Sequence, residues 1–317
     1  MIKKIAFIDT VHDVLQKGLT SLGWQCDDLS EKSKAEIDAV ISTYHGIVIR
    51  SRFPMNEDFL KNAQQVEFIA RSGAGMENID VPYCAARGIE LFNAPEGNRN
   101  AVAEHALGML LTLFNHLTRC DREVRSGIWL REENRGTELD GKTVGIIGYG
   151  NNGSAFANKL RGFDVQVLAY DKYKDEYGTK WVKESTWKDI QARCDVLSLH
   201  VPQNEETNYL INDQVIQSFS KPFYLINLSR GKIVETAALV KGLESGKILG
   251  ACLDVNEYEK ASFENLFDDF NSLPAAMQYI LKSEKVLLSP HVGGWTHESY
   301  FKLSDVLLQK IRKHYKI

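Results

Sequence analysis

The residues with the clearest chemical signature are three glycines that follow a short apolar stretch. Residues 144–153 read V-G-I-I-G-Y-G-N-N-G, so Gly148, Gly150 and Gly153 fit the spacing G-x-G-x-x-G. In such a turn the first glycine allows a sharp reversal, the second lets the backbone approach a pyrophosphate, and the third lets the following helix pack on the strand. The phosphates then lie at the positive end of that helix. The pattern predicts a dinucleotide-binding turn.

An acidic residue follows at the distance from these glycines that a nucleotide site requires. Asp171 closes the apolar stretch 165–170, where a carboxylate is placed to accept hydrogen bonds from the ribose hydroxyls of an adenosine. The same carboxylate repels a 2′-phosphate, so the pattern favours NAD over NADP. Lys172 comes next and would soften that repulsion. The competing interpretation is a glycine-rich turn with a capping aspartate.

Two further loops have residue types suited to an anion. The loop 72–75 follows the apolar stretch 68–70, and its backbone N–H groups are predicted to form an anion-binding nest. Arg50 and Arg52 follow the stretch 47–49, with both side chains expected on one face. Two arginines suit a dianion, and the alternative is a solvated basic strand end. The residues of the loop are Ser72, Gly73, Ala74 and Gly75.

The elements that must position these residues alternate between short apolar strands and helices. Helices are expected at 98–117, at 154–161, at 274–281 and from about residue 296. Such alternation predicts an α/β fold whose parallel sheets are covered by helices on both faces. Strands are expected at 5–8, 47–49, 68–70, 89–92, 144–147, 165–169, 196–199, 224–227, 250–253 and 286–288.

The order of these elements predicts two βα units. The first runs to about residue 97 and the second begins at 140–142, with the helix 98–117 between them. The C-terminal helix could return to the first unit, which would make that domain discontinuous.

Composition and charge exclude several classes of protein. Of the 317 residues, 44% are hydrophobic and 25% are charged, which is typical of a globular chain. A net charge of −4 gives no reason to expect nucleic acid as a partner. We find no apolar stretch long enough for a membrane span and no signal peptide, so we expect a cytoplasmic protein without a membrane partner. Five scattered cysteines without a C-x-x-C pair predict reduced thiols and no metal site.

Six further motifs accompany the glycine turn along the chain. They are SGAGMENID (72–80), AVAEHALGMLL (101–111), LHVP (199–202), INLSRGKIVE (226–235), GACLDV (250–255) and SPHVGGWTHES (289–299). In this order they resemble the family of D-isomer-specific 2-hydroxyacid dehydrogenases, and the resemblance runs from about residue 47 to residue 298.

The resemblance implies two Rossmann-like domains. An NAD-binding domain at 98–289 is inserted into a discontinuous, flavodoxin-like substrate domain formed by 1–97 and 290–317. A homodimer built on 98–127 is implied as well, and the loop 72–75 is expected to receive the carboxylate of a small 2-hydroxy or 2-keto acid. The residues implied in NAD binding are Gly148, Gly150, Asn151, Asn152, Gly153, Asp171, His200, Pro202, Leu228, Ser229, Arg230, Asp254, His291, Gly293 and Gly294.

Three residues match the catalytic set of this family. Arg230 matches the arginine of N-x-S-R-G, and His291 matches the histidine of P-H-x-G-G. Glu259 matches a glutamate that proline usually follows, but Lys260 stands in place of that proline, so Glu257 is the alternative. A histidine can remove the hydroxyl proton near neutral pH while a hydride leaves the alcohol carbon, and a carboxylate can orient its ring. An arginine can bind the substrate carboxylate and polarise the carbonyl oxygen.

The arginine pair indicates a substrate. It resembles an R-S-R stretch of bacterial 3-phosphoglycerate dehydrogenases, where such arginines face the substrate phosphate. We therefore expect oxidation of 3-phospho-D-glycerate, a step of serine biosynthesis, by a chain without the C-terminal regulatory domain of many relatives. The alternatives are a glyoxylate/hydroxypyruvate reductase, a D-lactate-type dehydrogenase and, in another class, an NAD-sensing corepressor-like interaction protein. Formate oxidation is disfavoured because that branch replaces the orienting acid by glutamine.

Two features near the C-terminus are unusual for the family. The segment 261–284 is longer than in many relatives and is rich in acidic and aromatic residues. It is interpreted as a surface elaboration or, alternatively, as a flap near the mouth of the cleft. Trp295 stands where relatives often carry Ser or Ala; if it lines the cleft, it narrows the cleft or stacks on the substrate.

Overall fold

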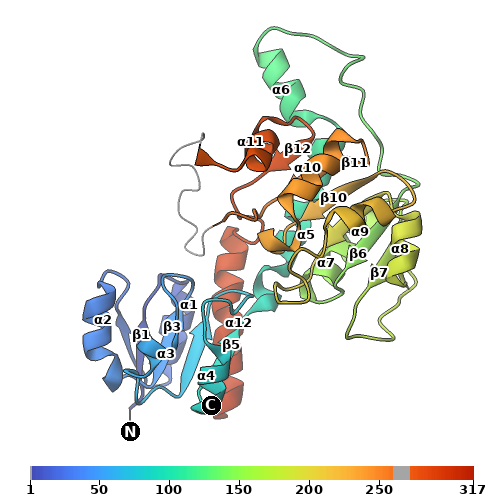
Figure 1. Cartoon of the computed structure of the whole chain (residues 1–317). Coiled ribbons are helices and arrows are strands. Elements are labelled where there is room, and N and C mark those ends of the chain that lie inside the picture. The colour runs from blue at the N-terminus through green and yellow to red at the C-terminus, as the bar shows by residue number, and fades with distance from the viewer. Residues whose placement is uncertain (1, 260–271) are drawn as a thin grey trace. The chain divides into compact units, whose positions relative to one another are not determined.

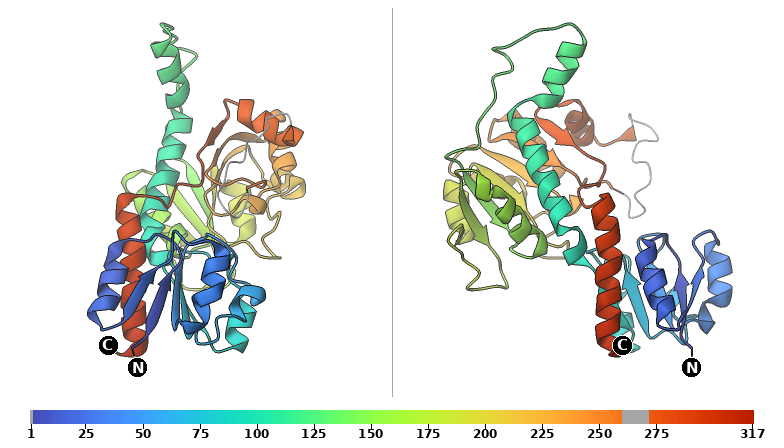
Figure 2. Two further views of the ribbon diagram at one scale, coloured as in Figure 1. Left: turned by 90° about the vertical axis from the view of Figure 1, so that its left-hand side faces the viewer. Right: turned by 180° about the vertical axis from the view of Figure 1, so that it is seen from behind.

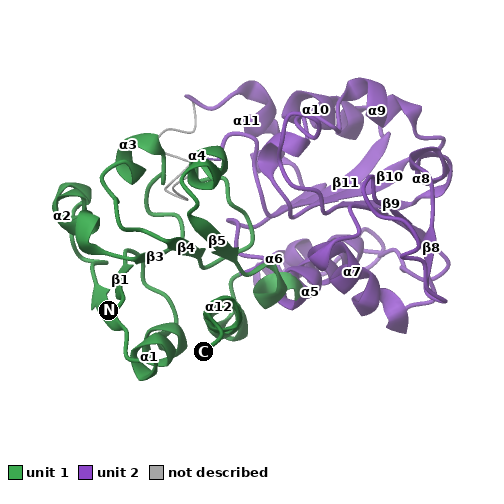
Figure 3. Cartoon of the chain, turned by 90° about the horizontal axis from the view of Figure 1, so that it is seen from below, with its two compact units in different colours: residues 1–99, 295–317 green, residues 100–294 purple. Residues whose placement is uncertain are grey.

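The computed structural model describes residues 2–259 and 272–317, and its contacts divide the chain into two compact units (Figure 3). Unit 1 consists of residues 1–99 and 295–317, and unit 2 consists of residues 100–294. The sequence analysis predicts that the chain passes from one domain to the other at 97/98 and at 289/290. In the structure the boundaries between the two units fall at 99/100 and 294/295.

Unit 1 contains a five-stranded parallel sheet with the strand order β2-β1-β3-β4-β5 (Figure 1). The strands are β1 (Lys4–Phe7), β2 (Gln25–Asp28), β3 (Gly46–Ile49), β4 (Phe68–Arg71) and β5 (Glu90–Asn93). The helices are α1 (Asp13–Ser21), α2 (Lys34–Val40), α3 (Glu57–Leu60), α4 (Val81–Ala86) and α12 (His297–Tyr315), with the 3-10 turn η1 (Ile41–Thr43).

Helices cover both faces of this sheet. Because side chains alternate along a strand, Ile5 and Phe7 join the core shared with α1 and α12, whereas Ala6 and Ile8 join the core shared with α2, α3 and α4. Helix α12 begins after Thr296, whose hydroxyl accepts from the N–H of Ser299. The C-terminal helix therefore belongs to the core of unit 1.

Unit 2 contains a seven-stranded parallel sheet with the order β12-β11-β10-β9-β6-β7-β8. The strands are β6 (Thr143–Ile147), β7 (Gln166–Tyr170), β8 (Val182–Glu184), β9 (Val196–Leu199), β10 (Phe223–Asn227), β11 (Ile248–Leu253) and β12 (Val286–Leu288). Helix α5 (Pro95–Phe114) begins in the last residues of unit 1 and continues into unit 2. The other helices of unit 2 are α6 (Leu117–Arg125), α7 (Asn151–Lys159), α8 (Trp187–Arg193), α9 (Asp213–Ser218), α10 (Thr236–Glu244) and α11 (Ala275–Lys282), with the 3-10 turns η2 (Leu160–Gly162) and η3 (Gly231–Ile233).

The predicted helix 98–117 is two helices in the structure. Helix α5 begins earlier, at Pro95, where the missing N–H of proline is harmless, and it ends at Phe114. His116 then adopts a left-handed conformation with φ +52°, and α6 follows. Figure 2 shows α6 and the segment after it standing away from the seven-stranded sheet, and α6 has no buried residue.

The predicted fold class is confirmed, because two parallel sheets carry helices on both faces. Strands β2 and β8 were missed by the sequence analysis. Both lie at the edge of a sheet, and their sequences, QCDD and VKE, are largely polar. An edge strand is paired on one side only and therefore tolerates such residues.

Within residues 2–259 and 272–317, no helix is long and apolar enough to cross a membrane. The same part of the chain contains no cluster of three His, Cys, Asp or Glu side chains that could hold a metal ion. All five cysteines are free thiols, and burial raises the pKa of Cys84 to about 11 and that of Cys194 to about 12. The thiols of Cys84 and Cys194 are therefore protonated at neutral pH.

Candidate active site

The glycine turn lies between β6 and α7, and the space around each of its three glycines differs. Gly148 has φ +91°, and a Cβ there would lie 2.7 Å from the carbonyl oxygen of His200. A Cβ on Gly153 would lie 2.0 Å from the carbonyl oxygen of Gly148, so only glycine lets α7 pack here. A Cβ on Gly150 would meet nothing within 4 Å. The turn is thus closed on the protein side and open at Gly150, which fits a pyrophosphate approaching the backbone.

Asn151 and Asn152 are the first two residues of α7. Gly150 precedes them as the N-cap and supplies no side-chain hydrogen bond to the helix. The first N–H groups of α7 therefore point to the side of the turn where a phosphate can accept hydrogen bonds.

Asp171 lies directly after β7, beside the glycine turn. Its Oδ2 accepts from the N–H of Tyr149 at 2.8 Å, and its Oδ1 accepts from the N–H of Tyr173 at 3.0 Å. The Tyr177 hydroxyl accepts from the N–H of Asp171 and donates to the carbonyl of Ala169, both at 3.0 Å. The carboxylate is therefore held in one orientation at the carboxyl end of the sheet.

His200 and Pro202 follow β9, the neighbour of β6 on the other side. The His200 ring lies 2.9 Å from the Ser198 hydroxyl through Nε2, and desolvation lowers the pKa of His200 to about 4. The ring is neutral at physiological pH. The carbonyl of Pro202 accepts from the Thr207 hydroxyl at 2.6 Å.

Arg230 lies in the loop between β10 and η3. Ser229 fixes this loop by donating its hydroxyl to the carbonyl of Leu199 at 2.5 Å, and Asn227 Nδ2 donates to the carbonyl of Arg230 at 2.9 Å. The Arg230 guanidinium donates to the carbonyl of Ser229 at 2.7 Å. A Cβ on Gly231 would lie 1.8 Å from the carbonyl oxygen of Asn256, so the loop packs tightly on the chain that follows β11. Leu228 in the same loop is buried.

Asp254 organises the loop that carries His291. Asp254 is 2% exposed, and its carboxylate accepts from the Ser289 hydroxyl at 2.6 Å, from the Val292 N–H at 2.9 Å and from the Gly293 N–H at 2.8 Å. Its backbone carbonyl accepts from the N–H of His291 at 2.8 Å. These bonds hold His291 at φ +54°, a left-handed conformation that is uncommon outside glycine.

His291 and Glu259 are in hydrogen-bond contact through Nδ1 and Oε1. A carboxylate only accepts, so Nδ1 carries the hydrogen. The two side chains are 25% and 22% exposed, which leaves the pair partly accessible. Both residues lie in unit 2, and the contact fixes the orientation of the imidazole ring.

Glu257, the alternative partner, is engaged elsewhere. Its Oε1 accepts from the Tyr209 hydroxyl at 2.9 Å and its Oε2 accepts from the N–H of Thr236 at 2.8 Å, at the start of α10. A carboxylate at a helix N-terminus satisfies an unpaired N–H and interacts favourably with the helix dipole. Of the two glutamates, the structure therefore brings Glu259 to His291.

The predicted arginine pair in unit 1 is not formed. Arg52 donates to the backbone carbonyls of Ile8 at 2.9 Å, Leu29 at 3.2 Å and Lys32 at 2.5 Å. Residues 50–52 lie beyond β3 in a bend, so the alternation of a strand no longer applies to them. The two guanidinium groups have different partners, and only Arg50 remains a candidate for substrate binding.

Arg50 is covered by Trp295. The Arg50 guanidinium carbon lies 4.0 Å from the centre of the Trp295 ring, and desolvation lowers the pKa of Arg50. Trp295 is 46% exposed. Within unit 1, Trp295 therefore makes a stacking contact with an arginine, and its predicted effect on the cleft stays a prediction. Of the segment 261–284, predicted to be a surface elaboration or a flap, residues 261–271 lie outside the described residues, and helix α11 lies in the remainder.

The loop 72–75 is partly engaged in the fold of unit 1. The N–H groups of Ser72 and Gly73 donate to the carbonyls of Ile49 at 2.8 Å and Arg71 at 2.9 Å. Those two donors are therefore not directed to an anion, which corrects the predicted four-residue nest. An anion bound here would take its hydrogen bonds from Ala74 and Gly75.

Sequence reasoning missed the residues behind the His291 loop. His105 on α5 lies 2.9 Å from the Ser289 hydroxyl through Nε2, and because that hydroxyl donates to Asp254, the histidine nitrogen donates to it. His105 lies in the motif AVAEHALGMLL and Ser289 begins the motif SPHVGGWTHES. Both motifs were noticed in the sequence, but nothing in the sequence shows that these two residues are in contact.

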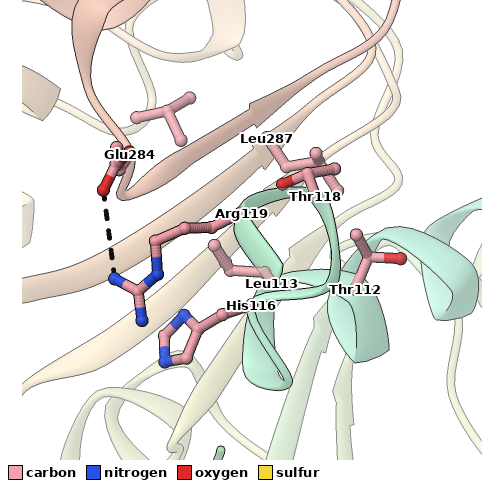
Figure 4. Close-up of a pocket in the computed structure, with 8 residues that line it drawn as sticks. Thr112, Leu113, His116, Thr118, Arg119, Glu284 and Leu287 are labelled. Carbon is pink, nitrogen blue, oxygen red and sulfur yellow. Dashed lines mark ion pairs between the residues drawn. The ribbon is translucent and has the colours of Figure 1, made fainter. Parts of the chain in front are cut away.

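A small hollow lies elsewhere in unit 2 (Figure 4). It is lined by residues of α5, α6 and the start of β12, among them Thr112, His116, Arg119 and Glu284. Arg119 and Glu284 approach to 3.9 Å across it. None of the predicted site residues lines this hollow, so it has no part in the candidate active site.

Comparison with known proteins identifies the family. Residues 107–293 match the family described as D-isomer specific 2-hydroxyacid dehydrogenase, NAD binding domain. The chain is 32% identical to D-3-phosphoglycerate dehydrogenase of Archaeoglobus fulgidus over 88% of its own length and 51% of that protein, so it spans about half the length of this relative. It is 31% identical to a hydroxypyruvate reductase of Thermotoga maritima over 96% of both chains.

A solved structure agrees with these matches. A D-lactate dehydrogenase from Aquifex aeolicus, complexed with NAD and lactic acid, has a TM-score of 0.81 and 27% identity, covering 99% of this chain and 96% of that one. The glycine turn, Asp171 and the parallel sheet have the arrangement of a dinucleotide-binding domain. The chain belongs to the D-isomer specific 2-hydroxyacid dehydrogenase family, and the matched region is the NAD-binding domain of that family. The predicted family, fold class and cofactor are confirmed.

Proposed function

We propose that this protein interconverts D-2-hydroxy acids and 2-keto acids with NAD. The observation that carries the proposal is the contact between His291 and Glu259 in a unit that also contains the dinucleotide turn. A histidine held by a carboxylate is the arrangement expected of a general acid–base pair. The binding residues are those of the glycine turn, with Asp171 for the adenosine ribose and the loop of Arg230 for the substrate side.

In this mechanism His291 moves the proton. The Glu259 contact uses Nδ1, so proton exchange with the substrate oxygen falls to Nε2. In oxidation His291 takes the hydroxyl proton, and in reduction the imidazolium returns it, with Glu259 stabilising the charged ring. Arg230 binds the substrate carboxylate through charge-assisted hydrogen bonds. The bound nicotinamide supplies or accepts the hydride.

For the substrate we propose 3-phospho-D-glycerate, oxidised to 3-phosphohydroxypyruvate, which would place the protein in serine biosynthesis. The phosphoglycerate dehydrogenases among its relatives support this choice. Hydroxypyruvate or glyoxylate reduction is the second candidate. It is favoured by the Thermotoga maritima relative, which this chain matches over nearly its full length, and by Arg52, whose hydrogen bonds to carbonyls leave one arginine instead of two for a phosphate.

A substrate panel tests both candidates. NADH formation or consumption is followed with 3-phosphoglycerate, glycerate, D-lactate and glycolate, and with the corresponding keto acids. We expect turnover of three-carbon substrates, and Arg50→Met should weaken phosphorylated substrates more than unphosphorylated ones. Equal losses for both classes would contradict a phosphate site at Arg50. Turnover of none of these acids would contradict the proposed function and revive the NAD-sensing alternative.

We also propose a homodimer that uses α6 and the segment after it. This region exposes large apolar side chains that a second copy would cover. They are Leu117, Val124, Ile128, Trp129 and Leu130, exposed by 43–76%. Sedimentation of the wild type should give a dimer, and Trp129→Glu should weaken it; a monomeric wild type would contradict this assembly.

A further inference from the structure

Two loops of unit 2 are joined by a charged contact beside Asp171. Lys172 follows Asp171 after β7, and its Nζ lies 2.8 Å from Oε1 of Glu206, in the loop after β9. The Tyr173 hydroxyl donates to Oε2 of the same carboxylate at 2.6 Å. Both oxygens of Glu206 are therefore engaged by residues adjacent to the ribose-binding aspartate.

The backbone of Glu206 is held in place by its own loop. Asn204 Oδ1 accepts from the N–H groups of Glu206 and Thr207, both at 3.0 Å, and the Thr207 hydroxyl donates to the carbonyl of Pro202. Because β6 lies between β9 and β7 in the sheet, the bridge joins the two loops that flank the glycine turn. Glu206 thus reaches the nucleotide end of the sheet from the opposite side to Asp171.

The charges at this position bear on the choice between NAD and NADP. Two lysines follow Asp171, and an ammonium group beside a ribose would attract a 2′-phosphate. Lys174 donates to the carbonyl of Tyr149 at 3.1 Å, and Lys172 is bound to Glu206. Hydrogen bonds from Lys172 and Tyr173 lower the pKa of Glu206, so its carboxylate is charged at neutral pH.

We propose that Glu206 is a specificity-determining residue for the cofactor. It binds Lys172, which would otherwise be available to a 2′-phosphate, and it adds a second negative charge to that of Asp171. Glu206 therefore reinforces the selection of NAD over NADP from a loop that is distant in sequence. The inference rests on the proposed function only in requiring a dinucleotide at the glycine turn.

Cofactor binding, measured without substrate, tests this proposal. NADH and NADPH are titrated against the full chain and the fluorescence of the bound nicotinamide is followed. Glu206→Gln should tighten NADPH binding about fivefold, because a unit charge that repels the 2′-phosphate is removed, and should leave NADH binding within about twofold. The gain should shrink as salt is added, because exposed charges are screened.

Glu205→Gln is the matched control, since it removes the same charge from the neighbouring exposed residue and leaves the Lys172 bridge in place. It should change the ratio of NADH to NADPH affinity little. In a Lys172→Met background, Glu206→Gln should give a smaller gain, because no ammonium group is left to be released. Equal effects of the Glu205 and Glu206 variants would overturn the proposal.

The outcome for the wild type separates this inference from the proposed function. A wild type that binds NADH, discriminates against NADPH and loses this discrimination in Glu206→Gln supports the inference even if no hydroxy acid is turned over. That lack of turnover would contradict only the proposed function. A wild type that binds neither dinucleotide would overturn this inference together with the cofactor assignment of the site.

Discussion

Each unit contains an aspartate that directly follows a parallel strand and accepts several hydrogen bonds from one neighbouring loop. In unit 1, Asp9 follows β1 and accepts from the N–H groups of Arg50, Ser51 and Arg52 at 2.6, 3.0 and 3.2 Å. In unit 2, Asp254 follows β11 and accepts from the Ser289 hydroxyl and the N–H groups of Val292 and Gly293. In both cases the charged acceptor fixes a loop that carries candidate substrate-binding or catalytic residues.

The two sites differ in how the carboxylate is used. All three donors to Asp9 meet one oxygen, Oδ2, and Asp9 is partly exposed. Asp254 uses both oxygens and is almost fully buried. In the loop of unit 1 the Arg52 side chain donates to backbone carbonyls. In the loop of unit 2 the His291 side chain forms a hydrogen bond with Glu259. The same way of fixing a loop therefore serves stability in unit 1 and chemistry in unit 2, according to the partner that the loop's side chains can contact.

The largest effect is expected at Asp254. Asp254→Asn keeps one carbonyl oxygen and places an amide against a donor, so one of the two buried N–H groups loses its acceptor and the remaining hydrogen bonds lose a charged one. We expect a loss of about 4 kcal/mol in the free energy of unfolding, measured by denaturant titration, because an unsatisfied buried donor costs about 1–3 kcal/mol and a charged acceptor strengthens each hydrogen bond by about 1 kcal/mol. Turnover should fall as well, since His291 loses its fixed backbone. A loss below about 1 kcal/mol would contradict the role given to this carboxylate.

Because the His200 side chain is desolvated at the end of a strand of unit 2, we also expect the stability of the fold to fall at acidic pH. Its pKa is lowered from 6.5 to about 4, so the unfolded chain binds a proton there over that interval and the folded chain does not. His200 therefore costs no stability above about pH 6.5 and destabilises progressively as the pH falls toward about 4, by up to about 3 kcal/mol. Comparing the unfolding of wild type and His200→Leu across this interval checks it; parallel pH curves would refute it.

A smaller effect separates the two arginines of unit 1. Arg52→Met removes three hydrogen bonds to carbonyls, and we expect a loss of about 2 kcal/mol in unfolding free energy, because a charged donor contributes about 1.5–3 kcal/mol. Arg50→Met is the matched control and should destabilise less, while having the larger effect on substrate affinity. A larger loss of stability in Arg50→Met together with a larger loss of substrate affinity in Arg52→Met would show that Arg52, not Arg50, is the residue available to substrate.

The smallest effect is expected at Asp9. An asparagine carbonyl can take the place of Oδ2 for all three N–H groups, so Asp9→Asn loses only the charge of the acceptor. We expect about 1 kcal/mol in a denaturant titration, well below the loss at Asp254. Equal losses at the two positions would remove the distinction between one-oxygen and two-oxygen binding.

The parts of the molecule that follow from local pattern could be predicted from the sequence. The ten apolar strands and the glycine turn depend on residues close together in the chain, and all ten strands have counterparts in the structure. Edge strands β2 and β8 were missed because they lack an apolar pattern. The partner of His291 was left open between two glutamates, since only the fold shows that Glu257 binds the start of α10.

Contacts between distant segments were beyond sequence reasoning. The bond between His105 and Ser289 and the bridge between Lys172 and Glu206 join loops whose proximity depends on strand order. Arg52 shows the opposite error, because strand alternation was extended past the end of β3 into a bend. A spacing rule is valid only as far as the element to which it belongs.

The most direct test of the account concerns His291. His291→Asn removes the proton-transferring ring, and asparagine tolerates the left-handed backbone at this position better than most residues. NADH turnover with the best keto acid of the panel is measured together with NADH affinity. We predict a fall in turnover of roughly 100- to 10,000-fold with NADH binding close to that of the wild type. A variant that keeps most of its turnover would contradict the assignment of His291 as the acid–base residue.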